Sequence, residues 1–348
     1  MIPVQNVYYM LSYAFRTLQE QGYKRLATEE FHNTAELCSA ILTKGLERQA
    51  KRGIYRDYME KTEPISALRG KLNISESVKM QTVRKKQMIC TVDDFSINTE
   101  LNQIIKSTML LLLRSDIDKS RKKAIRSLLT LLSEVDETDL HSVNWNQRYN
   151  RCNAEYRMLI SVCFLVYKGL LQTQKDGRTK LMDFVDDQRM CRLYEKFILE
   201  YYRKEHPELT ANASQIVWQL DDGFDAMLPN MQTDIMLSDG DRILIIDAKY
   251  YTHITQTQYG ISTWHSNNMY QIFTYVKNKE SELSGKPHSV SGMLLYAKTD
   301  EEKAYPSCTY QMSGNQISVH TLDLNTDFRE IKKQLDEIVE EWTAGKYL

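Results

Sequence analysis

Two aspartates and a lysine in the C-terminal half of the chain have residue types and a spacing that suit phosphodiester hydrolysis. Asp247 directly follows the apolar run Ile243–Ile246, where an uncompensated charge would be costly. Such a carboxylate either forms an ion pair at the strand end or coordinates a metal. Together with Asp234 it could hold Mg²⁺. Lys249 could then orient or help deprotonate the attacking water and stabilise the charge that builds on a phosphate.

A hairpin centred on Asp239-Gly240 would bring these residues together. Asp-Gly between two short apolar stretches is a strong hairpin signal. Strand pairing about this turn predicts that Asp234 and Asp247 lie side by side. Because side chains alternate along a strand, Lys249 is expected to point to the same face as Asp247.

The order Thr233-Asp234 … Asp247-Ala248-Lys249 resembles the PD-(D/E)xK nuclease motif, with threonine standing where the motif has proline. The resemblance implies a restriction-endonuclease-like fold. It also implies that Asp234, Asp247 and the backbone carbonyl of Ala248 bind the metal, expected to be Mg²⁺, and that catalysis depends on Lys249.

Four further residues are candidates for the same site. Gln271 and Tyr275 stand four apart on a predicted helix, as in RecB-like nucleases, where this pair positions the substrate or the active site; simple helix packing is the alternative. Glu195 stands where these nucleases often place a further metal-directed acid, and its alternative is a solvated helix face. His265 precedes the helix with Gln271 and could cap it or contact phosphate, although a structural role is favoured.

Similarity to one nuclease family extends over essentially the whole chain. The segments that carry it are Ile2–Ala14, Arg69–Leu72, Asp247–Tyr251 and His265–Gln271, which resemble the McrC family of McrBC 5-methylcytosine-specific restriction systems. The resemblance implies a DNA-cleaving subunit that docks on a McrB-like AAA+ GTPase ring and stimulates it, while the ring delivers double-stranded DNA with a modified cytosine. Two alternatives are a non-catalytic adaptor of the ring and a free-standing RecB-like nuclease.

The overall composition limits the classes of protein to consider. With 45 Lys and Arg against 46 Asp and Glu, bulk charge cannot hold the chain on nucleic acid, so any such site must be local. The six scattered cysteines include no Cys-x-x-Cys pair, which favours reduced thiols over a zinc ribbon or a disulfide framework. The N-terminus lacks a basic leader and the longest apolar run, Met109–Leu113, is too short to span a membrane, so we expect a cytoplasmic protein.

Two basic clusters, Arg84–Lys86 and residues 114–126, have no role in this scheme. A solvated face is the simplest interpretation. Either cluster could instead follow a phosphate backbone or an acidic surface of the partner ring. The sequence has no G-x-x-x-x-G-K-[ST] loop, so nucleotide hydrolysis by this chain alone is not expected.

The elements around these residues predict an α/β protein in two parts. Residues 176–348 are expected to form a PD-(D/E)xK nuclease domain with a mixed central sheet. Its helices are predicted at 188–205, 267–280 and 327–342, and its strands at 214–220, 235–237, 243–246 and 290–297, with a further hairpin at 313–315. Residues 1–175 are expected to form a partner-binding region, with helices at 5–21, 29–50, 100–114, 119–134 and 154–172 and a small β module at about 53–93. Only 13 glycines and 6 prolines in 348 residues favour such long helices.

Overall fold

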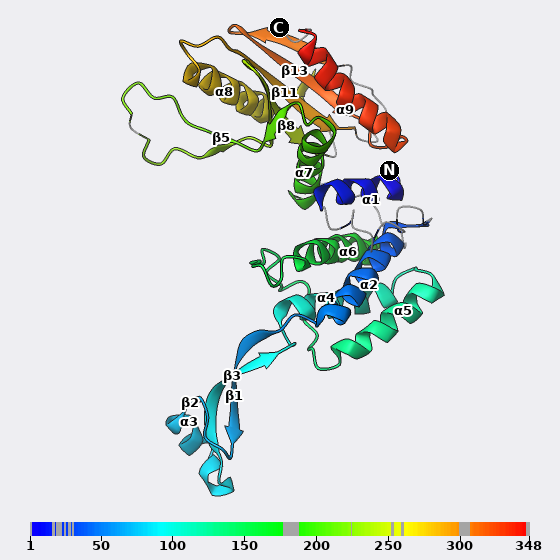
Figure 1. Cartoon of the computed structure of the whole chain (residues 1–348), viewed down its shortest axis with the longest axis vertical. Helices are drawn as coiled ribbons and strands as arrows, with labels where there is room; N and C mark the ends of the chain where they lie inside the picture. The colour runs from blue at the N-terminus through cyan, green and yellow to red at the C-terminus, as the bar shows by residue number, and fades with distance from the viewer. Residues whose placement is uncertain are drawn as a thin grey trace. The chain divides into compact units, whose positions relative to one another are not determined.

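The chain divides into two units by its internal contacts. The computed structural model describes residues 2–15, 18, 23, 26, 29, 31–176, 188–223, 225–251, 254–258, 261–298 and 307–345 (Figure 1). One unit, here the C-terminal unit, contains Met1–Glu20 and Asp183–Leu348, and the other, the helical unit, contains Gln21–Met182. The start of the chain therefore belongs with the C-terminal part, whereas the sequence grouped it with residues 1–175. The partner-binding role of that region stays a prediction.

A mixed six-stranded sheet forms the centre of the C-terminal unit, as expected. Its strand order is β12 (Cys308–Met312), β13 (Asn315–Leu322), β11 (Ser289–Ala297), β8 (Arg242–Lys249), β7 (Ile235–Asp239) and β4 (Thr210–Asn212). Strand β11 is parallel to both β8 and β13, and the other neighbours are antiparallel. Strands β8 and β11 are buried along nearly their whole length, in agreement with the apolar runs Ile243–Ile246 and Met293–Ala297 that they contain.

Helices cover both faces of this sheet (Figure 1). Helix α8 (Ser266–Glu282) lies on one side, and α7 (Gln188–Glu205) and α9 (Phe328–Thr343) lie on the other. Ile272 and Val276 of α8 share one apolar core with the sheet. A Cβ at Gly292 of β11 would lie 2.8 Å from both side chains. Glycine at this position therefore allows α8 to pack closely on the sheet.

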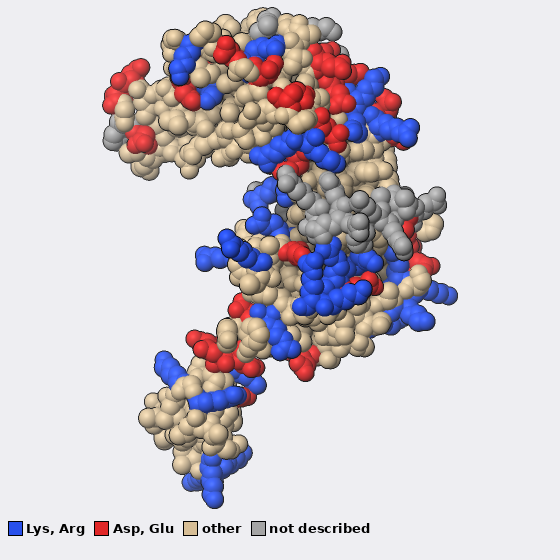
Figure 2. Space-filling model, in the orientation of Figure 1, with Lys and Arg blue, Asp and Glu red and all other residues tan. Residues whose placement is uncertain are grey.

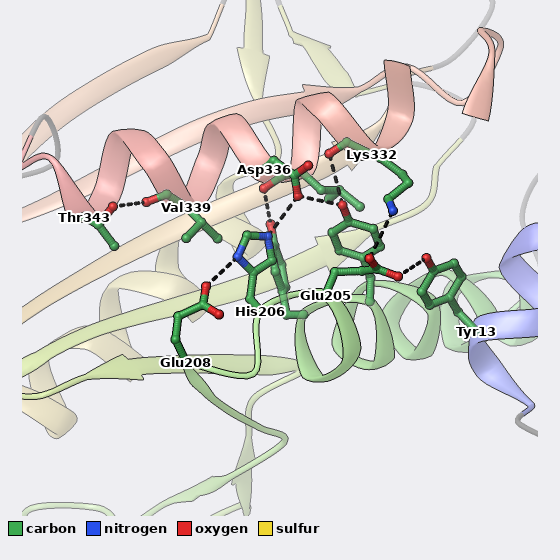
Figure 3. A network of polar contacts seen from close by, with 11 residues as sticks. Tyr13, Glu205, His206, Glu208, Lys332, Asp336, Val339 and Thr343 are labelled. Carbon is green, nitrogen blue, oxygen red and sulfur yellow. Dashed lines mark hydrogen bonds and ion pairs between the residues drawn. The ribbon is translucent and has the colours of Figure 1, made fainter. Parts of the chain in front are cut away.

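Polar contacts bind the first helix, α1 (Val4–Ala14), to the C-terminal unit. The Tyr13 hydroxyl donates a hydrogen bond of 2.6 Å to Glu205 of α7, and Lys332 of α9 donates one of 3.1 Å to the same carboxylate (Figure 3). The Asn6 side chain donates bonds of 2.9 and 2.7 Å to two backbone carbonyls shortly before α9. Tyr9 also stacks on Phe328, with ring centroids 4.2 Å apart. These long-range contacts explain why α1 belongs to this unit.

The helical unit contains α2 (Thr34–Arg52), α4 (Glu100–Leu113), α5 (Lys119–Leu129) and α6 (Tyr156–Asp176), which pack on one another. A 3₁₀ turn at Thr130–Leu132 follows α5. Side chains cap the first three of these helices, because Asn33, Thr99 and Asp118 each accept a hydrogen bond from a backbone N–H of the first turn. The predicted helices at these positions are thus confirmed, with ends that differ by a few residues.

The β module is defined here as residues 57–96 of the helical unit. Strands β1 (Asp57–Ile65), β3 (Met88–Ser96) and β2 (Lys71–Leu72) form an antiparallel sheet in the order β1-β3-β2. Helix α3 (Ile74–Lys79) and a 3₁₀ turn at Thr82–Lys85 connect β2 to β3. Gly70 has φ +69°, and a Cβ there would meet the Thr91 carbonyl oxygen at 2.2 Å, so the turn into β2 requires glycine.

Some predicted elements differ from the structure. The first helix ends at Ala14 rather than near residue 21. The strand expected at 214–220 is only β5 (Gln215–Ile216), which pairs with β6 (Met231–Gln232) outside the central sheet. Beyond β5 the chain bonds to other groups, since the Gln219 N–H donates to the side chain of Asn278. Two further strands, β9 (Thr255–Gln258) and β10 (Ile261–Trp264), form a hairpin before α8.

All six cysteines are free thiols. Among the helices that the structure describes, none combines the length and the apolar character needed to cross a membrane.

Candidate active site

The β7–β8 hairpin has the register predicted from its turn. Strand β7 pairs antiparallel with β8, with Ile235 opposite Ile246. Gly240 in the turn has φ +57°, a conformation that glycine adopts without strain. Asp234 and Asp247 are the next residues in this register, so they lie side by side at the end of the paired strands.

The two carboxylates have different surroundings. Asp247 is 1% exposed, and its Oδ2 lies 2.8 Å from Nζ of Lys249. Asp234 Oδ2 accepts a hydrogen bond of 2.9 Å from the backbone N–H of Ala248. Oδ2 is therefore held in an ion pair with Lys249, whereas Oδ1 has no partner within the described part of the chain. Because buried polar atoms nearly always have partners, Oδ1 is the atom that most needs a ligand.

The electrostatics of the site favour an added cation. Burial is the largest cause that raises the pKa of Asp234, and the charges of Asp247 and Glu195 contribute to a value of about 8. Burial also raises the pKa of Glu195. Burial alone would lower the pKa of Lys249, but Asp247 outweighs it and holds that pKa well above its usual range. One lysine thus faces several carboxylates, and a divalent ion would relieve their repulsion.

Helix α8 holds Lys249 through a chain of hydrogen bonds. The lysine Nζ donates to Gln271 Oε1 at 3.2 Å, and Gln271 Nε2 donates to the Tyr275 hydroxyl at 2.8 Å. That hydroxyl donates to the backbone carbonyl of Gln232 at 3.1 Å. Gln271 and Tyr275 can act together because residues four apart share a helix face. The chain therefore links the lysine to the strand just before Asp234.

Glu195 and His265 are not members of this hydrogen-bonded chain. Glu195 lies on α7, near enough to Lys249 and Asp247 for their charges to affect its pKa. His265 stands at the N-terminal cap position of α8, but its side chain makes no capping hydrogen bond, so the capping role considered from the sequence is wrong. Its ring packs edge-on against Tyr251, with centroids 5.3 Å apart.

The donor set fits Mg²⁺ rather than a metal enclosed by protein ligands. In the described residues, no group of three or more His, Cys, Asp or Glu side chains is arranged to hold a metal ion. Mg²⁺ is commonly bound by one or two carboxylates and keeps water or phosphate oxygens in its remaining positions. The Asp247 carboxylate, whose Oδ1 has no partner among the described residues, meets that requirement together with Asp234 and the carbonyl of Ala248.

Two residues that support the site were not found from the sequence. Gln232 contributes only its backbone carbonyl, for which a sequence holds no signal. Gly292 was detectable in principle, since a glycine inside an apolar strand often marks a close approach of another element. It permits the close packing of α8, the helix that carries Gln271 and Tyr275.

The chain that carries this fold matches a known family. The model of the family described as McrBC 5-methylcytosine restriction system component matches residues 4–297. The chain therefore belongs to this family, which confirms the resemblance inferred from the sequence.

The similarity to one curated relative extends over nearly the whole chain. The Type IV methyl-directed restriction enzyme EcoKMcrBC of Escherichia coli (strain K12) is 28% identical over 347 residues, with 98% of each chain covered. Two solved structures from Thermococcus gammatolerans are also similar. The refined half-complex of a tetradecameric assembly of McrB AAA+ hexamers with bound McrC is 17% identical, with a TM-score of 0.48 over 97% of this chain and 76% of that one. The cryo-EM structure of the McrBC complex is 19% identical, with a TM-score of 0.41 over 59% of each chain.

Proposed function

We propose that the C-terminal unit is a PD-(D/E)xK nuclease domain and that the chain is the Mg²⁺-dependent, DNA-cleaving subunit of a restriction complex. One observation carries the proposal. Asp247 is buried with Oδ2 in an ion pair with Lys249 and with no partner for Oδ1 among the described residues, and a second carboxylate lies beside it on a hairpin of fixed register. A purely structural ion pair would not require Asp234 at the same place.

Each residue of the site has a distinct role in the proposed hydrolysis. Asp234, Asp247 and the Ala248 carbonyl would hold Mg²⁺, which supplies Lewis-acid stabilisation of the charge on the phosphate when bound. Lys249 would orient the attacking water and help to stabilise the same charge. Gln271 and Tyr275 fix the position of the lysine ammonium. Glu195 would add negative charge near the metal, and His265 would contact the phosphate of the substrate.

The proposed substrate and partner follow from the family. The E. coli relative is named as a methyl-directed restriction enzyme, so we assign duplex DNA with modified cytosine to this chain as its substrate. The partner would be a McrB-like AAA+ GTPase ring, which brings the DNA and is stimulated by this chain. A complex that restricts DNA in this way would act in the cytoplasm.

The β module is the proposed docking surface for the ring. Apolar side chains on it are unusually exposed, including Tyr58 (71%), Val78 (65%) and Met80 (71%). In Figure 2 the module, at the bottom of the view, shows uncharged areas between patches of Lys and Arg side chains. Val78 and Met80 lie close together in the chain at α3, and exposed large apolar side chains of this kind are typical of protein interaction sites.

The decisive experiment replaces Asp247 by alanine and measures two activities with the partner ring present. We expect DNA cleavage to be lost while stimulation of GTP hydrolysis is retained. Asp241→Ala is the matched control, because Asp241 is exposed in the turn of the same hairpin. Unchanged cleavage by a folded Asp247→Ala protein would contradict the proposed site and favour an adaptor. Cleavage by the unaltered chain without any ring would indicate a free-standing nuclease.

A further inference from the structure

Helix α5 in the helical unit carries an unbalanced positive charge. Its sequence from Lys119 to Leu129 contains five cations and no acid. Arg121 is used internally, since it pairs with Glu29 at 3.0 Å and lies over the ring of Phe31. The other four, Lys119, Lys122, Lys123 and Arg126, are called the basic stripe. None of them forms an ion pair with another residue in the described part of the chain.

The basic stripe occupies one face of the helix. Its members stand at positions i, i+3, i+4 and i+7, which is the spacing of a single face. Ile125 and Leu128, on the opposite side, are buried in the helical unit. In Figure 2, Lys and Arg side chains lie at the right-hand edge of the view, where Figure 1 places α5. The stripe is therefore presented outward by a helix whose other face is fixed.

The stripe does not serve the stability of α5. The N-terminus of a helix carries positive partial charge, so cations in the first turns are unfavourable there and acids are favourable. Helix α5 has no acid in its first turn, and only the capping side chain of Asp118 opposes the charge. Four like charges on one face also repel one another. Such an arrangement would be stabilised by a negatively charged partner outside the chain.

The kind of partner follows from a comparison with the β module. Protein interfaces depend on apolar and aromatic anchors and contain few lysines. The β module has exposed apolar side chains such as Val78 and Met80, whereas three of the four residues in the stripe are lysines. Contacts with nucleic-acid phosphates come mostly from Lys and Arg and need no apolar anchor. The stripe spans the eight residues from Lys119 to Arg126, or roughly 10 Å of helix, which is comparable to the axial rise of about three base pairs of duplex DNA.

We propose that the basic stripe of α5 binds the phosphate backbone of duplex DNA, independently of base sequence. The proposal rests on the proposed function only in taking DNA as the substrate. It assigns to the helical unit a contact with DNA in addition to its docking on the ring. Such a contact lies outside the nuclease unit and would hold the duplex without reading its bases.

The test measures DNA binding by the full-length chain without Mg²⁺, so that no cleavage occurs. The variant carries Lys119→Gln, Lys122→Gln, Lys123→Gln and Arg126→Gln, because glutamine keeps the helix propensity of the residues it replaces. The probe is a fluorescent 30-base-pair duplex without modified bases, and its anisotropy is followed across a series of salt concentrations starting at about 50 mM. The matched control is Arg84→Gln, Lys85→Gln and Lys86→Gln, which removes a similar charge from the β module.

We expect the α5 variant to bind DNA at least tenfold more weakly at low salt. The slope of log affinity against log salt should fall by roughly 3, because each lost phosphate contact contributes about 0.9. The control variant should keep the slope of the unaltered protein. An unchanged slope in the α5 variant, or no DNA binding by the unaltered chain at low salt, would overturn the proposal.

One further outcome would assign the stripe to an acidic protein surface instead. In that case the α5 variant would bind DNA normally and lose stimulation of the GTPase ring. None of these results depends on Mg²⁺ or on Asp247, so the nuclease assignment stands or falls separately.

Discussion

The end of strand β8 and the β module differ in which kind of side chain lies in an unfavourable environment. At β8 a carboxylate is almost fully buried behind an apolar strand, and its neighbours are fixed by register and by α8. In the β module, strand β1 is exposed along most of its length, and large apolar side chains face outward. Each arrangement has a cost for folding. A buried charge and an exposed apolar surface both indicate a partner, a cation in the first case and a protein in the second.

The largest effect is expected from removing the lysine of the site. Lys249→Ala should lower ring-dependent DNA cleavage by about a thousandfold, because the charge that builds on the phosphate loses its stabilising cation. Docking on the ring should not change, since the β module is untouched. Cleavage rates and GTP hydrolysis measured on the same preparation check this. Lys286→Ala, at an exposed position, is the control.

The β module is tested by placing charge on its apolar surface. Val78→Asp with Met80→Asp should weaken binding to the ring by about a hundredfold, because two exposed apolar contacts are replaced by carboxylates. Direct binding measured by calorimetry provides the readout, with Lys79→Ala on the same helix as control. If these variants bound normally, docking would have to occur elsewhere.

A smaller loss is expected when the support of the lysine is removed. Gln271→Ala should reduce cleavage by roughly tenfold, because it breaks two hydrogen bonds of the chain, one of them to Lys249, without removing a charge. Tyr275→Phe should reduce it by less, because the two bonds that it breaks do not involve the lysine. Mg²⁺ affinity should be unaltered in both variants. A loss of Mg²⁺ binding would show that α8 supports the carboxylates rather than Lys249.

The smallest effect is expected in the pH dependence of the melting temperature when no metal is present. The pKa of Asp234 is raised in the folded state, so its contribution to stability is present at low pH and is lost as the pH rises from about 4 towards 8. In EDTA, the melting temperature of the unaltered protein should fall by about 2–4 °C over this range relative to Asp234→Asn. Added Mg²⁺ should remove the difference. Parallel melting curves for the two proteins would argue against a buried, repelling pair.

The candidate site could be predicted to the extent that local patterns define it. The Asp-Gly turn fixes the register of the hairpin, and alternation places Lys249 beside Asp247. The spacing of Gln271 and Tyr275 predicts a shared helix face, which the structure confirms. Their contact with Lys249 depends on how α8 lies on the sheet. Sequence periodicity gives no information about the distance between α8 and the strand that carries Lys249.

The errors in the fold have a different physical origin. The three-residue strand β4 is too short to show alternation, so it was not predicted. Tyr13 and Glu205 are 192 residues apart, and no local pattern indicates that they form a hydrogen bond. Because no local pattern reveals this contact, α1 was assigned from the sequence to the same region as residues 15–175. The basic cluster at 114–126 was likewise treated as one feature, although Arg121 has internal partners and the stripe does not.

The contacts of α1 have a practical consequence for dividing the chain into fragments. In chain order, the helical unit is an insertion between α1 and the rest of the C-terminal unit. A fragment that starts at α7 would leave Glu205 without the Tyr13 hydroxyl and Phe328 without the ring of Tyr9. An independent nuclease fragment should therefore be made by deleting the insertion and joining α1 to α7 through a flexible linker.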